Sequence, residues 1–499
     1  MLSVTYAGSL MADGETAEVE GRLRDAERWL DDADQPSIEP SGKGTDRVVA
    51  DHDAFRRLPA TIAIYRAAQA QGAGDIDGVM AHASRALEAT AVDDHFERGA
   101  ASGFLALAHW RTGNLETAYA HWVDTMASLQ RAGHAVDALG CIRALAEIRI
   151  AQGRLQDAKR LYDRGLTLAN ERAGSVLRGA ADLHVGLAGV LIEWNDVSSA
   201  LEHLAASEEL GEQAGLALNP FRWRVAKARV REVEGDRAGA LELLDEAERV
   251  YVGEFYPDVR PVGALRARLW IAAGRLAEAT DWAADVGISV EDELSYLREF
   301  EHVTLARLLM ARAGSDTSGE LLRSALALLE RLSAAADAGG RLRSLIEVLV
   351  LQAAVYERLG DRRAAEDSLE RSLTLAEADR PVRVFVDEGV PMIRLLATAI
   401  GRGVAVGYAR ALLDAVSNSE ERIYGTRGLV EPLSSRELDV LRLLATDLDG
   451  PGIARELVVG VSTVRSHTKS IYAKLAVNSR RAAVRRAEEL GLLASAGAN

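Results

Sequence analysis

The apolar positions of the chain recur at helical spacing along most of its length. In a typical stretch, Leu241, Leu244 and Ala247 are three residues apart and fall on one face of a helix. We find no convincing run with the two-residue alternation of a half-buried strand. The composition agrees, because long stretches are rich in Ala, Leu, Arg and Glu, while the 499 residues include only 10 prolines. The sequence therefore predicts an all-α fold.

A short phrase recurs within this helical region. Each copy begins with Gly or Asn, continues with a polar residue and often an aliphatic one, and has Ala five positions after its first residue. The full copies begin at Gly113, Gly153, Asn195, Gly235, Gly274 and Gly360, and their alanines are Ala118, Ala158, Ala200, Ala240, Ala279 and Ala365. Weaker copies without the Ala begin at Gly74 and Gly314. Successive copies are 39 to 46 residues apart, so we interpret the region as a repeat array.

The phrase has a simple structural interpretation. Glycine tolerates the left-handed backbone that ends a helix, and the polar residue after it begins the next helix. Alanine suits a point where two helices cross closely and a larger side chain would push them apart. Each repeat is therefore expected to be a hairpin of two helices of about 15 residues, and stacked hairpins bury one another's apolar faces.

The pattern changes twice toward the C-terminus. We assign residues 1–400 to the array, with repeats from about 15 to 380 and a loop at 37–45. Residues 401–432 are expected to form a terminal helix at about 405–416 and then a linker. In residues 433–499 we expect four helices, at about 435–446, 450–457, 463–475 and 480–490. Asp449 is expected to cap the second and Ser462 the third, with a tight turn at Gly460 between them. This order is the helix-turn-helix plan.

The third of these helices separates two faces. Val464, Thr468, Ile471 and Leu475 follow helical spacing and predict a buried stripe. Another face presents three candidates for reading DNA bases, Arg465, Ser466 and Lys469. Arg donates two hydrogen bonds to guanine O6 and N7 in the major groove, and Lys reaches the same acceptors. The candidates for phosphate contacts are Thr463, His467, Lys474, Arg480 and Arg481. The alternative is a solvated helix surface, with Lys474 favoured near the C-terminus by the helix dipole.

The charge distribution supports a polyanionic partner for the C-terminal module alone. The whole chain has a formal net charge of −16, which is unusual for a nucleic-acid-binding protein. Residues 455–486, however, contain eight basic residues and one acid, a net charge of +7, so the rest of the chain has −23. An acidic body with a compact basic patch fits a soluble array and a module that meets DNA.

The C-terminal residues resemble the LuxR-type DNA-binding domain over about 60 residues without a gap. The matching segments are Leu433-Ser434-Ser435-Arg436-Glu437, Ile453-Ala454, Ser462-Thr463-Val464-Arg465-Ser466-His467, Lys474-Leu475 and Leu490-Gly491-Leu492. The resemblance implies a DNA-binding transcription regulator. Two residues depart from the family pattern: Gly452 replaces an acid or a polar helix former, and Gly460 replaces a frequent Ser. Gly452 costs about 1 kcal/mol relative to Ala, and we expect the fold to survive it.

The array resembles the tetratricopeptide repeat (TPR), although its period exceeds the usual 34 residues. It also resembles the sensor arm of MalT-like regulators, which are large ATP-binding LuxR proteins. The runs Phe-Arg-Trp-Arg-Val-Ala at 221–226 and Val-Arg-Val-Phe-Val-Asp-Glu-Gly at 382–389 are similar to that group. No G-x-x-x-x-G-K-[ST] motif occurs, so the ATPase and ATP control are not expected. We interpret the chain as a shortened relative or one that starts late.

Nothing in the sequence predicts an enzyme, a cofactor or a metal site. The H-E-x-x-H, G-x-S-x-G and dinucleotide-loop motifs are all missing from the sequence. The single cysteine, Cys141, excludes an intrachain disulfide and is expected to be a small core residue. The aromatic residues of the array either line a groove or pack between repeats, and packing is favoured. They are Trp110, Trp122, Trp194, Trp223, Tyr251, Tyr256, Trp270, Trp282 and Tyr296.

We therefore expect a transcription regulator that binds double-stranded DNA through the C-terminal module, as a homodimer, while the array senses an unknown small molecule or protein. RNA polymerase is a further candidate partner. The alternative is a TPR-like interaction scaffold in which the helix-turn-helix is only a docking surface. No apolar run is long enough to span a membrane and no secretory signal is recognised, so we expect a cytoplasmic, nucleoid-associated protein.

Overall fold

The computed structural model describes residues 2–12, 15–31, 51–170, 177–253, 256–314, 318–425, 435–446, 448–457, 459–475, 477 and 479–489. All regular secondary structure in these ranges is helical, and they contain no strand. The all-α prediction is therefore confirmed. The loop expected at 37–45 lies outside the described residues.

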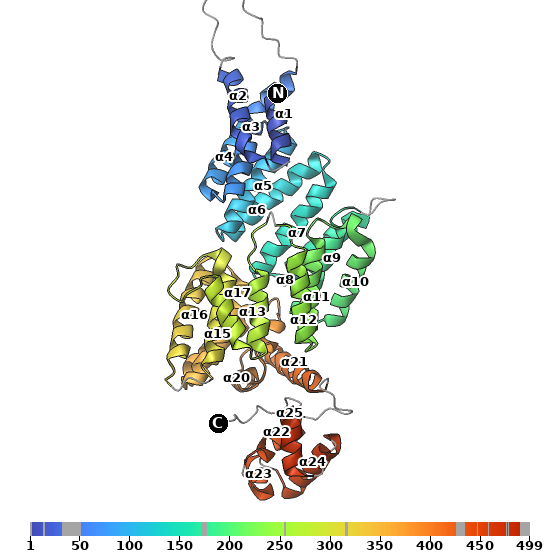
Figure 1. Ribbon diagram of the computed structural model, residues 1–499, viewed down its shortest axis with the longest axis vertical. Helices are drawn as coiled ribbons and strands as arrows, with labels where there is room; N and C mark the ends of the chain where they lie inside the picture. Colours follow the sequence, from blue (N-terminus) through green and yellow to red (C-terminus); the bar gives the residue numbers. More distant parts are fainter. Residues whose placement is uncertain are drawn as a thin grey trace, which may run out of the picture.

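The helices follow one another as a long array and then a small C-terminal domain (Figure 1). The array contains α1 (Leu2–Ala12), α2 (Val19–Asp31), α3 (His52–Ala73), α4 (Ile76–Ala89), α5 (His95–Arg111), α6 (Leu115–Arg131), α7 (Ala135–Ala151), α8 (Leu155–Asn170), α9 (Ala180–Glu193), α10 (Val197–Ala214), α11 (Asn219–Val233), α12 (Arg237–Arg249), α13 (Val262–Ala272), α14 (Leu276–Asp285), α15 (Glu299–Arg312), α16 (Glu320–Ala338), α17 (Leu342–Leu359) and α18 (Arg362–Ala376). It is followed by α19 (Arg383–Val386), α20 (Val390–Gly401), α21 (Val406–Gly425), α22 (Ser435–Leu444), α23 (Gly450–Glu456), α24 (Val461–Lys474) and α25 (Arg480–Glu489). Two short 3-10 helices occur at Thr16–Glu18 and Tyr296–Arg298.

The recurring phrase makes the turn inside each helix pair. Its first residue has a left-handed backbone in all six full copies, with φ between 63° at Asn195 and 85° at Gly235 and Gly360. The polar residue after it caps the next helix where it is Asp: the Asp236 carboxylate, for example, accepts from the Gly239 amide at 2.9 Å. The six phrase alanines are at most 1% exposed. The interpretation of the phrase as a helix-ending turn with a close crossing is confirmed. The weaker copy at Gly314 does not adopt the left-handed backbone.

The array closes on itself. The chain turns back after α12, so that α17 contacts α7 and α19 contacts α9, and α13–α18 lie beside α7–α12 (Figure 1). Three hydrogen bonds seal this contact: Trp194 Nε1 donates to the Asp379 carbonyl at 2.8 Å, the Gln156 amide to the Asp379 carboxylate at 2.8 Å, and the Val382 amide to the Glu193 carbonyl at 2.8 Å. The segment that leads to the C-terminal domain is thus bound to the middle of the array.

The expected linker at 417–432 is partly wrong. Helix α21 runs to Gly425, beyond the end at 416 that the sequence predicted. Its start is anchored by the buried Tyr408, Leu412 and Val416, and the run of Glu420, Glu421 and Arg422 favours continued helix. The remainder of the expected linker, 426–432, lies outside the described residues.

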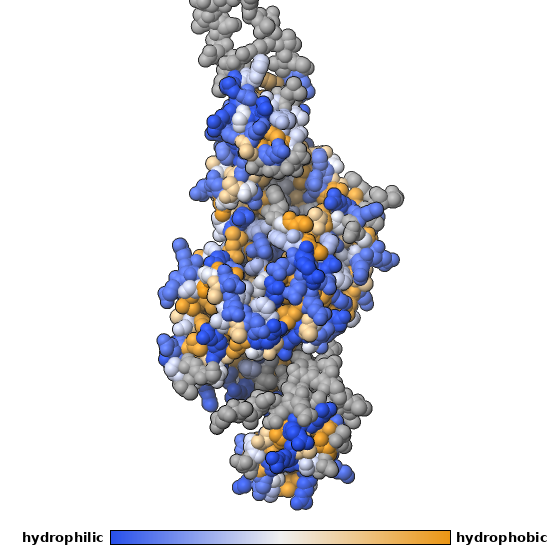
Figure 2. Space-filling view, viewed as in Figure 1, coloured by the Kyte–Doolittle hydropathy of each residue, from blue (hydrophilic) through white to orange (hydrophobic). Residues whose placement is uncertain are grey.

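The surface of the array is mixed. On the face shown in Figure 2, hydrophilic residues predominate and apolar residues are scattered among them. In the described part of the chain, no helix is long and apolar enough to cross a membrane.

Candidate functional site

Helices α23 and α24 form the expected helix-turn-helix. The Asp449 carboxylate caps α23 by accepting from the Gly452 amide at 2.8 Å, and Pro451 lies in the first turn of that helix, both as predicted. Helix α24 begins at Val461, so Ser462 lies in its first turn instead of capping it. The Gly460 carbonyl instead accepts from the amides of Thr463 and Val464.

One face of α24 is fixed in the core of the domain. Val464, Ile471 and Leu475 are at most 3% exposed and pack with Leu441 of α22 and other core residues. Thr468 turns its hydroxyl back to the Val464 carbonyl at 2.8 Å. The predicted stripe is confirmed for Val464, Ile471 and Leu475, while Thr468 is half-buried, and the stripe fixes the rotation of α24 about its axis.

The three base-reading candidates lie on the exposed side of α24. Arg465, Ser466 and Lys469 are exposed, and within the described residues their side chains form no hydrogen bond or ion pair. One guanidinium, one ammonium and one hydroxyl group on the same helix are therefore available to an outside partner. Thr463 and Arg481 are also exposed, and His467 is half-buried.

The other two phosphate candidates are engaged inside the domain. Lys474 Nζ forms an ion pair with the Glu437 carboxylate at 2.9 Å, and these side chains are 14% and 6% exposed. The Arg480 guanidinium donates to the carbonyl of Leu444, the last residue of α22, at 2.8 Å and to that of Leu448 at 2.7 Å. A phosphate contact from either side chain would have to compete with these bonds.

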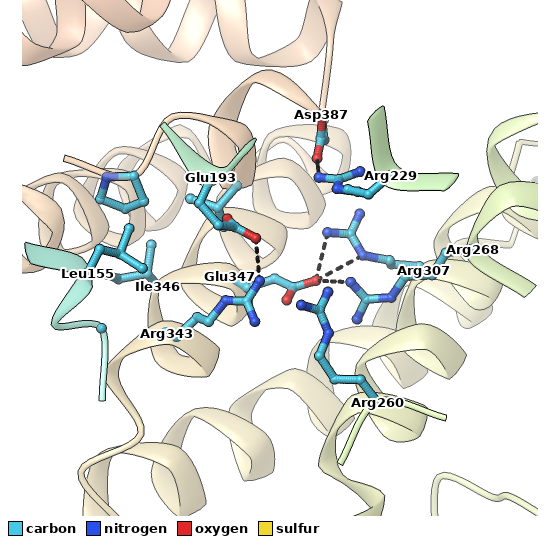
Figure 3. A pocket seen from close by; sticks show the side chains of 13 residues that line it. Leu155, Glu193, Arg229, Arg260, Arg268, Arg307, Arg343, Ile346, Glu347 and Asp387 are labelled. Atoms are coloured by element: carbon cyan, nitrogen blue, oxygen red, sulfur yellow. Dashed lines mark hydrogen bonds and ion pairs between the residues drawn. The ribbon is translucent and has the colours of Figure 1, made fainter. Parts of the chain in front are cut away.

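A second candidate site lies in the interior of the array. A cavity of about 520 Å³ opens between α7, α9, α11, α13, α15, α17 and the end of α19. A smaller pocket that shares most of its lining with this cavity gathers five arginines and three carboxylates, which we call the arginine cluster (Figure 3). The members are Arg229, Arg260, Arg268, Arg307, Arg343, Glu193, Glu347 and Asp387.

Most members of the arginine cluster are paired. Glu347 accepts from Arg268 Nη1 at 2.6 Å and from Arg307 Nη2 at 2.9 Å. Burial opposes ionisation of Glu347, but Arg268 and Arg307 outweigh it and hold the pKa of this carboxyl well below its usual value. Ion pairs also join Arg229 to Asp387 and Arg343 to Glu193.

Arg260 is the exception. Among the described residues it forms no ion pair with a carboxylate, and its Nε has no hydrogen-bond acceptor. Its guanidinium lies 4.7 Å from the centre of the Phe300 ring. Burial has the largest effect on the pKa of Arg260, and the nearby Arg343 cation has the second largest. They lower this pKa to about 9, so the side chain stays charged at neutral pH.

The comparisons with known proteins agree with this architecture. Residues 60–401 match the MalT-like TPR region, and residues 431–487 match the luxR family of bacterial regulatory proteins. The chain belongs to the family with a MalT-like TPR region. In this chain a MalT-like array precedes a luxR-family helix-turn-helix domain, as predicted, and the combination is that of a DNA-binding regulator.

Solved structures resemble the MalT-like array in fold. A Rap protein complexed with competence and sporulation factor has a TM-score of 0.50 and 14% identity, with 76% of this chain and 97% of that chain covered. The apo quorum sensor NprR from B. thuringiensis has a TM-score of 0.44 and 13% identity, with 75% and 97% covered.

The aromatic side chains of the MalT-like array serve mainly in packing. Trp110 and Trp122 are 3% and 5% exposed, and each has its ring centre 5.6 Å from that of Tyr256. None of the nine candidates lines the 520 Å³ cavity. The favoured interpretation, packing between repeats, is confirmed for the buried members. Cys141 is 2% exposed, and burial raises the pKa of its thiol to about 12, as expected for a core residue.

Sequence reasoning missed the cavity. Its members come from segments separated by up to about 245 residues, so no local spacing reveals them. A signal was present, however. The runs at 221–226 and 382–389, which carried the MalT-like resemblance, supply Phe221, Arg222, Asp387 and Glu388 to the cavity wall.

Proposed function

We propose that the protein is a transcription regulator that recognises a specific DNA sequence with α24. The observation that supports this most strongly is the pair of faces of that helix. Buried Val464 and Ile471 fix one face, while Arg465 and Lys469 project unpaired from the exposed side. The major groove, about 12 Å wide, admits an α-helix, and Arg and Lys match the acceptors of guanine there.

The exposed residues of α24 and α25 would have different roles. Arg465, Ser466 and Lys469 read base edges, while Thr463, His467 and Arg481 contact the phosphate backbone and set the position of the helix. Lys474 and Arg480 would mainly stabilise the domain, because they already bind Glu437 and the carbonyls at the end of α22. The small domain offers limited contact area with DNA, so the protein would bind two half-sites as a homodimer. The DNA-bound regulator would then act on RNA polymerase.

The MalT-like array would sense the effector. Its superhelix encloses a cavity, and the segment around Asp379 that closes the array precedes α20 and α21 in the chain. An effector that changed the contact between the Asp379 segment and the middle of the array would alter the position of the helix-turn-helix domain that follows. The similar Rap protein was solved with competence and sporulation factor, which supports an effector role for this kind of array.

Retention of genomic DNA fragments by the full chain, with non-specific competitor present, tests the proposal. We expect wild type to retain a discrete set of fragments. The variants Arg465→Ala and Lys469→Ala each lose about 1–3 kcal/mol of binding free energy, which is about 5- to 150-fold in affinity. Arg442→Ala, on the exposed surface of α22, is the matched control. Equal retention by all forms would favour the interaction scaffold instead.

A further inference from the structure

The interior cavity of the array combines unsatisfied positive charge with an apolar wall. Arg260 lacks a carboxylate partner, and Nε of Arg260 and Nη2 of Arg268 are buried without an acceptor in the described part of the chain. Figure 3 shows Arg268, Arg307 and Arg343, from α13, α15 and α17, and Arg260, from the segment before α13, converging on the region around Glu347. Nitrogen donors of a cation that find no acceptor in the protein are costly unless an outside group supplies one.

The pairing of the charged side chains favours an anion beside Arg260. The arginine cluster has five guanidinium groups and three carboxylates. Each of these carboxylates already has an arginine partner: Glu347 has Arg268 and Arg307, Glu193 has Arg343, and Asp387 has Arg229. The wider wall adds five carboxylates and two arginines, so the charges of the whole lining nearly balance. Three of these carboxylates pair with Arg222, Arg229 and Arg307, and among the described residues none forms an ion pair with Arg260.

The rest of the cavity is apolar. The side chains of Val185, Val190, Val225, Leu265 and Leu269, from α9, α11 and α13, line it. Buried apolar side chains next to a few convergent charged donors are typical of small-molecule sites, and a volume of about 520 Å³ falls in their range of 300–1,000 Å³. A folded partner domain does not fit in such a space.

We propose that the cavity binds a small organic anion with an apolar body, whose carboxylate or phosphate is held by Arg260 together with Arg268 and Arg343. Arginine suits this role because its planar fork donates two parallel hydrogen bonds to such oxyanions. The apolar body lies against the valines and leucines of α9, α11 and α13. This inference rests on the proposed function only where it makes the ligand the effector of the regulator.

The unpaired charge of Arg260 is also expected to affect the stability of the array. A cation held beside Arg343 without an ion-pair partner destabilises the array, and a bound anion removes that cost. Substituting Arg260 by an uncharged residue is therefore expected to raise the melting temperature of the unliganded protein, or leave it unchanged, while weakening the binding of anions.

Calorimetric titration of the full chain with octyl phosphate, octanoate and octan-1-ol tests the proposal. These probes share an apolar chain and differ in the head group. We expect saturable binding of octyl phosphate or octanoate to wild type, and binding of octan-1-ol weaker by about tenfold or more. Arg260→Gln is expected to lose about tenfold or more in affinity for the anion, whereas Arg260→Lys, which retains the charge, loses less. Arg363→Gln, on the outer surface with a side chain 92% exposed, is the control and is expected to bind like wild type.

Three results would overturn the proposal: no saturable binding of either anion, equal affinity for the anion and the alcohol, or undiminished binding by a folded Arg260→Gln. Tighter binding of an acidic peptide than of both small anions, lost in the same variant, would assign the cavity to a peptide and also contradict the proposal.

DNA retention is measured on the same preparations. If DNA binding persists while the anions fail to bind, only the cavity inference fails. If the anions bind and DNA does not, the proposed function fails instead.

Discussion

Arg229 of α11 forms an ion pair with Asp387, which lies 158 residues further along the chain at the end of α19. Asp387 also pairs with Arg383, and these arginines outweigh burial and hold the pKa of its carboxyl below the usual value. The pair joins the middle of the array to the segment that leads through α20 and α21 toward the DNA-binding domain. Removing it is the simplest way to loosen the closed array.

Asp387→Asn is expected to destabilise the array. The amide keeps the shape of the side chain but leaves Arg229 and Arg383 without their shared anion. Because the Asp387 side chain is only 24% exposed, we expect a loss of about 2 kcal/mol, between the values for surface and buried pairs. Urea or thermal unfolding followed by circular dichroism measures it. The control is Asp367→Asn, whose partner Arg363 is 92% exposed and whose loss should have almost no effect. Equal melting of both variants would show that the closure contact contributes little.

The stability of the array should fall in mild acid because of a histidine pair. His184 and His203 bring their Nδ1 atoms within 2.8 Å, so both cannot be protonated there at low cost. Burial lowers the pKa of each below the ordinary 6.5. The native state then binds protons less readily than the unfolded state. The contribution of the two neutral histidines to the free energy of unfolding is therefore complete above about pH 6.5 and is lost as the pH falls below it.

Melting temperatures measured from pH 7.5 to 5.5 test the histidine pair. His203→Gln is expected to reduce the drop, because the glutamine amide cannot be protonated in this range. The drop should not vanish, since burial also lowers the pKa of His82, His109 and His121. His52→Gln, at an exposed position of α3, should melt like wild type at every pH. A pH dependence unchanged in His203→Gln would remove the pair as its cause.

Neighbouring arginines of α25 should behave differently when replaced. Arg480→Ala removes the donors to the carbonyls of Leu444 and Leu448, so it should lower the stability of the C-terminal domain by about 2 kcal/mol. Arg481→Ala, at an exposed position, should leave stability unchanged and reduce the slope of log affinity for DNA against log salt by about 1. Thermal unfolding and a salt titration separate the two effects. Equal stability of both variants would contradict the structural role of Arg480.

Local signals predicted much of the fold. The turn at Gly113 and the close crossing at Ala118 follow from the conformational freedom and size of single residues, and both were predictable. The buried stripe of α24 was predictable for the same reason, since Val464 and Ile471 lie on one short helix. The end of α21 was not, because no strong breaker stops the helix before Gly425.

The arginine cluster lay beyond sequence reasoning for a different reason. Glu193, Arg260 and Asp387 are far apart in the chain and meet only because the superhelix closes. That closure depends on bonds such as the one from Trp194 to the Asp379 carbonyl, which no periodicity encodes. In the C-terminal domain, packing of α25 against α22 likewise directs Arg480 toward the carbonyls at the end of α22, although its sequence position suggested a phosphate contact.

The central claim is that α24 reads a DNA sequence, and the most direct measurement is the specificity ratio of the full chain. The affinity for a retained genomic fragment is compared with that for a scrambled fragment of equal length at one fixed salt concentration. We predict a ratio of about 10³ or more for wild type, falling by about tenfold or more in Arg465→Ala and in Lys469→Ala, while Arg442→Ala keeps the wild-type ratio. A wild-type ratio near one, or a ratio that neither α24 variant changes, would contradict the account.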